Sequence, residues 1–324
     1  MDTNKNRICF AAVFFLTAIA LTASSSFAAA ENKQLVRFVQ DTNKIDILIG
    51  GNLLTTYRYG SELTKPILYP VNSPSSILLT RHFPFEIIPG ESNDHPHHMG
   101  IFFAYDKVNN DGFWNNRTSP PQIKHIKTTK MENGQLSTIS HWDGNSGKTL
   151  LEEKRDMIFS AEANQYTIDF NITLTAQDDK IVFGDTKEGM FAIRVADWLS
   201  ENKGTGKYLD SDGNIGEPNI WGKKATWVRL EGQKDGKTIG IAIFNHPAIA
   251  CFPTYWHARG YGLFSANPLG QLDFLKGRNI ENPQPLNFTL FPGQSALFRF
   301  RMIIYEGQKS AEQLEKEFQK FARQ

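Results

Sequence analysis

Cysteine is nearly absent from this chain: its 324 residues include only Cys9 and Cys251. Cys9 lies in an N-terminal segment that we expect to be removed, so the mature protein would keep one cysteine and could form no intrachain disulfide. A chain of this length can bury enough apolar surface to fold without such crosslinks.

Long hydrophobic runs are scarce as well. The longest, residues 8–21, follows Lys5 and Arg7 and precedes a stretch of small residues ending at Ala30, which is the layout of a secretory signal peptide. No later segment approaches the roughly eighteen apolar residues that a membrane span needs. We therefore predict a signal peptide over residues 1–30 and a periplasmic or secreted protein without membrane insertion.

An excess of charge of one sign is also missing. Removing residues 1–30 takes Lys5, Arg7 and Asp2 away from 35 basic and 34 acidic side chains, which leaves 33 of each. This balance argues against nucleic acid as a partner. Together with 12% aromatic residues, it suits a carbohydrate ligand.

Several motifs that would define an activity do not occur. There is no Gly-x-Ser-x-Gly elbow for a nucleophilic serine, and the sequence around Gly204–Lys207 lacks the spacing of a phosphate-binding loop. There is also no His-Glu-x-x-His helix, cysteine pair or EF-hand loop. We expect no cofactor, with a divalent metal as the open alternative.

What the chain has in abundance is alternation of apolar and polar residues. Residues 166–174 and 296–304 alternate in this way, and residues 238–244 read as a shorter buried strand. Turn sequences such as those at 143–145, 212–214 and 235–236 indicate antiparallel connections. We predict an all-β fold, a large antiparallel β-sandwich that forms a single domain over residues 31–324.

One helix is predicted, at the C-terminus. Ser310 can cap it, and Gln313 occupies the capping-box position. Leu314, Phe318 and Phe321 would make one apolar stripe, so the helix should pack on the outside of the sheets.

Residues 81–116 form the most informative segment, because four histidines, several carboxylates and Trp114 crowd into turn-rich sequence. Imidazoles and carboxylates are suited to proton transfer or metal binding near neutral pH. His95 and His97 would lie on the same side of an extended chain and could form a metal-binding pair. The alternative is that these histidines only hydrogen-bond backbone carbonyls.

Two further regions carry candidate site residues. Residues 183–194 contain Glu188, in a turn that could equally be solvated, and Arg194, whose guanidinium within an apolar strand needs a partner. Residues 244–262 place His246 and the run Tyr255-Trp256-His257 among prolines and glycines. Aromatic rings beside hydrogen-bonding groups are what a sugar site requires, although the same rings could belong to the core.

Three segments together resemble a known family: Tyr69-Pro70-Val71 with Thr80-Arg81, residues 89–98, and residues 253–268. The chain resembles an uncharacterised bacterial family whose sequences are commonly labelled methane oxygenase PmoA. A membrane-integral subunit would need hydrophobic spans that this chain lacks, so the label does not describe its activity. The resemblance implies a fold similar to the large β-supersandwich of galactose mutarotases and a role in polysaccharide degradation.

We therefore expect a periplasmic carbohydrate-active enzyme that uses acid/base chemistry on an oligosaccharide or modified sugar. It would act as a lyase or dehydratase, or hydrolyse an activated glycoside. The catalytic candidates are His97, His98, Glu188 and His257, and the substrate-binding candidates are Arg81, Asp94, Trp114, Arg194, His246, Tyr255 and Trp256. The two arginines would hold a carboxylate or a developing oxyanion. An aldose epimerase or mutarotase, or a non-catalytic sugar-binding protein, are the alternatives.

Overall fold

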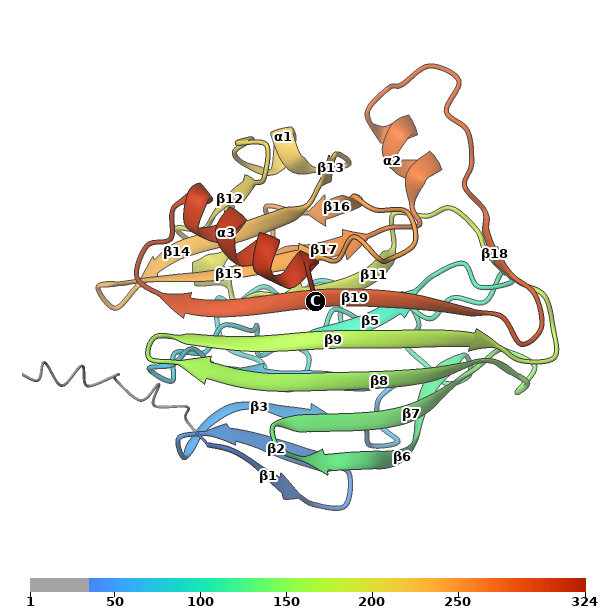
Figure 1. Ribbon diagram of the computed structural model, residues 1–324, viewed down its shortest axis with the longest axis horizontal. Helices are drawn as coiled ribbons and strands as arrows, with labels where there is room; N and C mark the ends of the chain where they lie inside the picture. The colour runs from blue at the N-terminus through green and yellow to red at the C-terminus, as the bar shows by residue number, and fades with distance from the viewer. Residues whose placement is uncertain (1–34) are drawn as a thin grey trace, which may run out of the picture. The chain divides into compact units, whose positions relative to one another are not determined.

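Strands are the main regular structure in the computed structural model, which describes residues 35–324 (Figure 1). The predicted signal peptide lies outside the described residues. The strands of residues 35–324 pair antiparallel in two large sheets and one small one, so the predicted all-β class is confirmed. No helix within the described residues is long and apolar enough to cross a membrane.

The first sheet has nine strands in the described part of the chain. In spatial order they are β1 Val36–Gln40, β2 Lys44–Ile49, β3 Asn52–Arg58, β4 Ile67–Val71, β5 Ile101–Tyr105, β11 Gly189–Arg194, β17 Leu263–Asn267, β16 Thr254–Ala258 and β13 Lys224–Ala225.

The second sheet has eight strands within residues 35–324. In order they are β12 Lys207–Asp210, β14 Trp227–Lys234, β15 Lys237–Asn245, β19 Ser295–Glu306, β9 Gln165–Ala176, β8 Thr149–Glu162, β7 Gln135–Asp143 and β6 Gln122–Glu132. A separate pair consists of β10 Ile181–Phe183 and β18 Phe288–Leu290.

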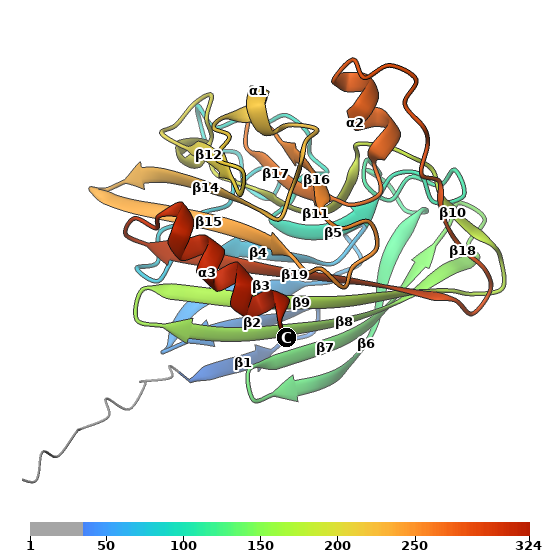
Figure 2. The ribbon, with the colours of Figure 1, turned by 45° about the horizontal axis from the view of Figure 1, so that its top comes forward.

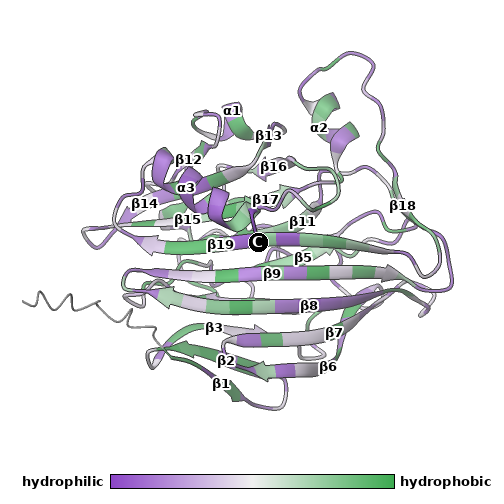
Figure 3. Cartoon of the chain, in the orientation of Figure 1, coloured by the Kyte–Doolittle hydropathy of each residue, from purple (hydrophilic) through white to green (hydrophobic). Residues whose placement is uncertain are grey.

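The core lies between the two large sheets. The ring of Phe191 on β11 packs against Phe170 on β9 and Phe300 on β19, with centroids 4.7 and 4.8 Å apart. Alternate residues of β9 and β19 are buried, as the sequence predicts for 166–174 and 296–304, and Figure 3 shows the alternation of hydrophilic and hydrophobic residues along β9. Each strand thus contributes one apolar face to the sandwich.

The predicted C-terminal helix is α3, Ala311–Ala322, and its capping box is present. Its residues Leu314, Phe318 and Phe321 are buried against Phe244 and Ile303 of the eight-stranded sheet. Figure 2 shows α3 lying against this sheet. The prediction that the helix packs outside the sheets is confirmed.

Two further helices and a 3₁₀ turn were not predicted. They are α1 Glu217–Ile220, α2 Gln271–Gly277 and η1 Asp197–Leu199. All three are short and have no side-chain cap hydrogen bond, so neither apolar periodicity nor a capping residue marks them in the sequence.

Candidate active site

The candidate site lies on the face of the nine-stranded sheet that points away from the eight-stranded sheet. Residues in register on antiparallel strands share a face, and Phe102, Ala192, Ser265 and His257 are in register across β5, β11, β17 and β16. Phe191, one residue along β11, packs into the core instead. Arg194 is two residues from Ala192 and therefore shares the outer face with His257.

The histidine-rich segment forms a tight turn over this face. His95 has φ of +42°, and the amide of His98 donates to the carbonyl of His95 at 3.0 Å. The prediction that His95 and His97 lie on the same side of an extended chain is wrong. Pro96 is fixed in φ and suits the second position of a turn, which reverses the chain between the two histidines.

Asp94 bridges two buried arginines. Its Oδ1 atom accepts hydrogen bonds from Arg81 at 2.5 Å and from Arg194 at 2.6 Å, and its Oδ2 atom lies 3.0 Å from Nδ1 of His95. Both arginine side chains are fully buried. The carboxylate between the two arginines thus belongs to the chain itself, and that the pair also holds a carboxylate or a developing oxyanion of a substrate stays a prediction.

Charge and burial act together on this group of ions. Burial, followed by repulsion from Arg194, lowers the pKa of Arg81 to about 10. Burial by itself would raise the pKa of Asp94, but Arg194, the hydrogen bond with His95, and Arg81 outweigh it and lower that pKa. Asp94 is therefore ionised at neutral pH and compensates the two guanidinium groups.

Three parallel rings lie next to this bridge. The ring of His95 is stacked on Tyr261, with centroids 5.1 Å apart and an angle of 2°, and on His98 at 4.9 Å and 1°. The guanidinium of Arg194 lies 4.7 Å from the centre of the Tyr261 ring and that of Arg259 lies 5.5 Å from it. Burial raises the pKa of Tyr261 to about 12, so its phenol stays protonated.

His97 and His98 are both buried and neutral. Burial and then Lys65 lower the pKa of His97 to about 3, and burial and then His97 lower the pKa of His98 well below its usual value. Both ring nitrogens of His98, and Nδ1 of His97, have no hydrogen-bond partner among residues 35–324. Buried nitrogens without a protein partner call for a water or a ligand atom.

His257 has a defined tautomer. Its Nδ1 atom lies 2.9 Å from the backbone carbonyl of Lys187, which can only accept a hydrogen bond, so the proton is on Nδ1 and Nε2 carries a lone pair. Burial and then Arg259 lower its pKa to about 3. Glu188 follows Lys187 in the chain and is partly exposed. Its Oε1 atom lies 3.0 Å from Nζ of Lys187 in an ion pair.

Trp114 and Lys65 are two buried residues close to the histidines. Trp114 is fully buried, with its ring 5.7 Å from His98, and thus offers no surface to a substrate. Burial lowers the pKa of Lys65 to about 7, and its ammonium donates to the carbonyls of Phe113 and Trp114 at 3.2 and 3.0 Å. These bonds fix the backbone that carries Trp114.

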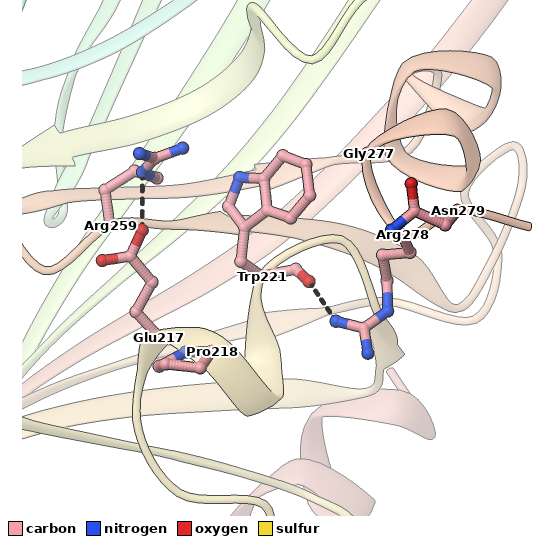
Figure 4. A pocket seen from close by; sticks show the side chains of 7 residues that line it. All are labelled: Glu217, Pro218, Trp221, Arg259, Gly277, Arg278 and Asn279. Atoms are coloured by element: carbon pink, nitrogen blue, oxygen red, sulfur yellow. Dashed lines mark hydrogen bonds and ion pairs between the residues drawn. The ribbon is translucent and has the colours of Figure 1, made fainter.

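A pocket of about 440 Å³ adjoins the cluster (Figure 4). Its lining includes Trp221, which lies 6.3 Å from His257 in a T-shaped contact, and Arg259, which lies 5.9 Å from the centre of the Trp221 ring. Glu217 forms an ion pair with Arg259, with its Oε1 atom 2.8 Å from Arg259 Nε. The guanidinium of Arg259 lies over the rings of both Trp221 and Tyr261, and these contacts connect the pocket to the histidines.

Three predicted residues do not join the cluster. Trp256 is fully buried on the core side of the sheet, where its indole donates to the carbonyl of Ala225 at 3.1 Å. His246 follows β15, and its ring packs 5.1 Å from Phe321 of α3. Tyr255 shares a face with His257, but it is stacked on Phe274 of α2 at 5.3 Å. We therefore leave Trp256, His246 and Tyr255 out of the proposed site.

Some residues of this arrangement were not predicted as site residues: Lys65, Glu217, Trp221, Arg259, Tyr261 and Arg278. Arg259 and Tyr261 follow His257 closely, so their proximity could have pointed to them. Glu217 begins the short helix α1 and Arg278 directly follows α2, neither belongs to a motif, and only the folded chain brings them together.

Metal binding is not favoured by any donor cluster in the described residues. Over residues 35–324, no three His, Cys, Asp or Glu side chains are arranged to hold a metal ion. His95 and His97 approach with ring centroids 5.6 Å apart at an angle of 73°.

Comparison with solved structures finds proteins of the same general layout. A galactose mutarotase related enzyme from Lactobacillus acidophilus is 8% identical, with a TM-score of 0.35 and coverage of 85% of this chain and 98% of the other. A galactose mutarotase-like protein from Clostridium acetobutylicum is 9% identical, with a TM-score of 0.35 and coverage of 86% and 99%. These similarities are too low to carry a functional argument.

A search of curated protein sequences finds no significant match. A family model, described as a family of unknown function (DUF6807), matches residues 44–319. The match covers most of the chain and includes all residues of the candidate site. The chain belongs to this family of unknown function.

Proposed function

We propose that the protein is a carbohydrate-active enzyme that transfers protons to and from a sugar at the cluster of His97, His98, His257 and Glu188. The observation that carries the proposal is the meeting of buried, unprotonated imidazoles with a partly exposed carboxylate on one face of the sheet. General acid/base catalysis needs positioned groups that can accept a proton and return it, and imidazole and carboxylate side chains can both do so.

His257 is the best placed base. The Lys187 carbonyl holds its proton on Nδ1, so the Nε2 lone pair is available to accept a proton. A pKa of about 3 keeps the ring unprotonated at neutral pH. A substrate that brings negative charge or develops it would raise this pKa and strengthen the base.

Glu188 and Tyr261 complete the chemistry. Glu188 is close enough to Tyr261 for its charge to raise the pKa of that phenol, after the larger effect of burial. The phenol is a hydrogen-bond donor at neutral pH, and the carboxylate is an acceptor. In this proposal the phenol binds a sugar oxygen, and Glu188 acts as the second acid/base group.

A sugar is the substrate class that these surroundings suit best. Trp221, Tyr261 and His95 offer ring faces and edges, while Arg259, Glu217 and Asp94 offer charged hydrogen-bonding groups beside them. Sugars need both, because their CH groups pack on rings and their hydroxyls require directional partners. The proposed reaction is elimination or dehydration, or hydrolysis of an activated glycoside. We also propose that the protein acts in the periplasm.

An epimerase or mutarotase is the second candidate. The site supports it because a neutral imidazole and a carboxylate can move a proton between a ring oxygen and the anomeric hydroxyl without losing any group.

Mass spectrometry of oligosaccharide panels, including oxidised and unsaturated ones, tests the proposal. Loss of the mass of one water indicates dehydration, gain of it indicates hydrolysis, and polarimetry on free sugars detects mutarotation. His257→Asn should abolish the change, because the Asn amide can replace Nδ1 but supplies no base. Retention of full turnover in this variant would rule out the proposed role of His257.

A further inference from the structure

We propose that the pocket bounded by Trp221, Arg259 and Arg278 is a subsite for a sugar residue that carries a carboxylate, a uronate. This inference rests on the proposed function, since it names the substrate class of the same site. It assigns the sugar ring to the space beside Trp221 and the carboxylate to Arg278.

The lining of the pocket has an excess of positive charge. It contains two guanidinium groups, Arg259 and Arg278, and one carboxylate, Glu217. Glu217 is already engaged, because it forms an ion pair with Arg259 at 2.8 Å and also accepts a hydrogen bond from the amide of Gly260. The charge of Arg278 is therefore left without compensation from within the pocket.

Arg278 is held in place for an anion. Its Nη1 atom donates to the backbone carbonyl of Trp221 at 2.9 Å, as Figure 4 shows. No carboxylate among residues 35–324 lies within 4.0 Å of its guanidinium. A planar guanidinium fixed by one bond keeps its other N–H groups for a bidentate contact, and a carboxylate matches that geometry.

The helix end nearby does not cancel this charge. Gly277 closes α2, and the partial negative charge of a helix C-terminus would disfavour an anion. However, the backbone N–H of Arg278 caps the last turn through the carbonyls of Phe274, Leu275 and Lys276. A helix of seven residues also has a weak field beyond its own last turn.

The pocket is the right size and lies beside the proposed base. Its volume of about 440 Å³ falls in the range of small-molecule sites, about 300–1,000 Å³. Trp221 lines the pocket and packs against His257, so in this proposal a sugar ring bound beside Trp221 is separated from the imidazole by one side chain. Arg259 connects the pocket to the histidine cluster, because its guanidinium lies over the rings of Trp221 and Tyr261.

Calorimetric titration with trigalacturonate and with neutral galactotriose tests the inference. The mature protein should bind the acidic trisaccharide at least about tenfold more tightly, and the difference should shrink with added salt. Arg278→Met should lose this preference, and Arg278→Lys should restore part of it. Lys276→Met removes a positive charge from the same helix outside the pocket and should keep the full preference.

The outcomes separate the inference from the proposed function. Equal affinity for both trisaccharides, no binding of either, or an unchanged preference in a folded Arg278→Met variant would overturn the uronate subsite. These results would leave the proposed catalysis on neutral sugars unaffected. Binding of trigalacturonate that depends on Arg278, with no product from any sugar, would support the subsite and overturn the proposed catalysis.

Discussion

The Nδ1 atom of His257 lies 2.9 Å from the backbone carbonyl oxygen of Lys187. This contact joins β16 to the segment that carries Glu188 and fixes which ring nitrogen can act as a base. Two substitutions separate the two nitrogens. Asparagine places an amide N–H near Nδ1, whereas glutamine places an amide near Nε2.

His257→Asn should keep the contact with Lys187 and lower the turnover of any substrate by about 10²- to 10⁴-fold, because a general base is lost. The melting temperature should change little. The measurement is kcat/KM with thermal unfolding of the same preparation. A variant that unfolds early but keeps its turnover per folded molecule would show that His257 has only a structural role.

Protonation of His257 should be coupled to stability. Its pKa is about 3 in the folded protein and about 6.5 in the unfolded chain. The neutral ring therefore stabilises the fold fully above pH 6.5, and this contribution is lost as the pH falls toward 3. Between those values the free energy of unfolding should fall by about 1.4 kcal/mol per pH unit from this residue alone.

Urea unfolding of the wild type and of His257→Gln at pH 4.5 and 6 measures that slope. Glutamine has no titrating group, so the variant should lose less stability over this interval. Equal slopes in the two proteins would mean that His257 takes up a proton in the folded state as readily as in the unfolded chain.

Asp94→Asn should destabilise the protein by about 1–3 kcal/mol, because two buried guanidinium groups lose their shared carboxylate. The pKa of Asp94 is lowered in the folded protein, so its contribution is present above the ordinary aspartate pKa of about 3.9 and is lost in stronger acid. Chemical unfolding at pH 7 tests the first statement, and the loss should be smaller near pH 3. Asp46→Asn removes a carboxylate from β2 and serves as a comparison. A larger loss in acid than at neutral pH would contradict the bridge.

Gly277→Ala should displace Trp221. A Cβ atom at Gly277 would lie 2.3 Å from Cη2 and 2.7 Å from Cζ3 of that indole, so the ring or the helix must move. We expect a loss of about 1–3 kcal/mol and weaker sugar binding. Tryptophan fluorescence and calorimetry check both, with Lys276→Ala as the control on the same helix. An unchanged emission spectrum and affinity would mean that the indole has room to adapt.

Most of the β architecture could be predicted because a period of two leaves a strong signal. The alternation over residues 166–174 and 296–304 identified β9 and β19, and the apolar stripe with Ser310 identified α3. The need of Arg194 for a partner was also visible, since a buried guanidinium requires one.

The rest depends on how the chain turns between strands. The left-handed φ of His95 and the reversal at Pro96 could not be read from spacing, so the paired histidines were placed wrongly. Tyr255, Trp256 and His257 were predicted to lie together, but they are consecutive residues of a strand, so Trp256 faces away from its two neighbours. Glu217 and Trp221 are far from Arg278 in the sequence, and only the folded chain brings the three residues together in one pocket.

The central claim is that neutral histidines from separate segments surround one sugar. Nitrogen NMR of histidine-labelled protein, assigned with single His→Gln variants, tests it directly. We predict that His97, His98 and His257 are unprotonated at pH 6, that His257 is protonated on Nδ1, and that an added sugar shifts the resonances of all three. Charged rings at pH 6, or sugar-induced shifts confined to histidines elsewhere in the chain, would contradict the account.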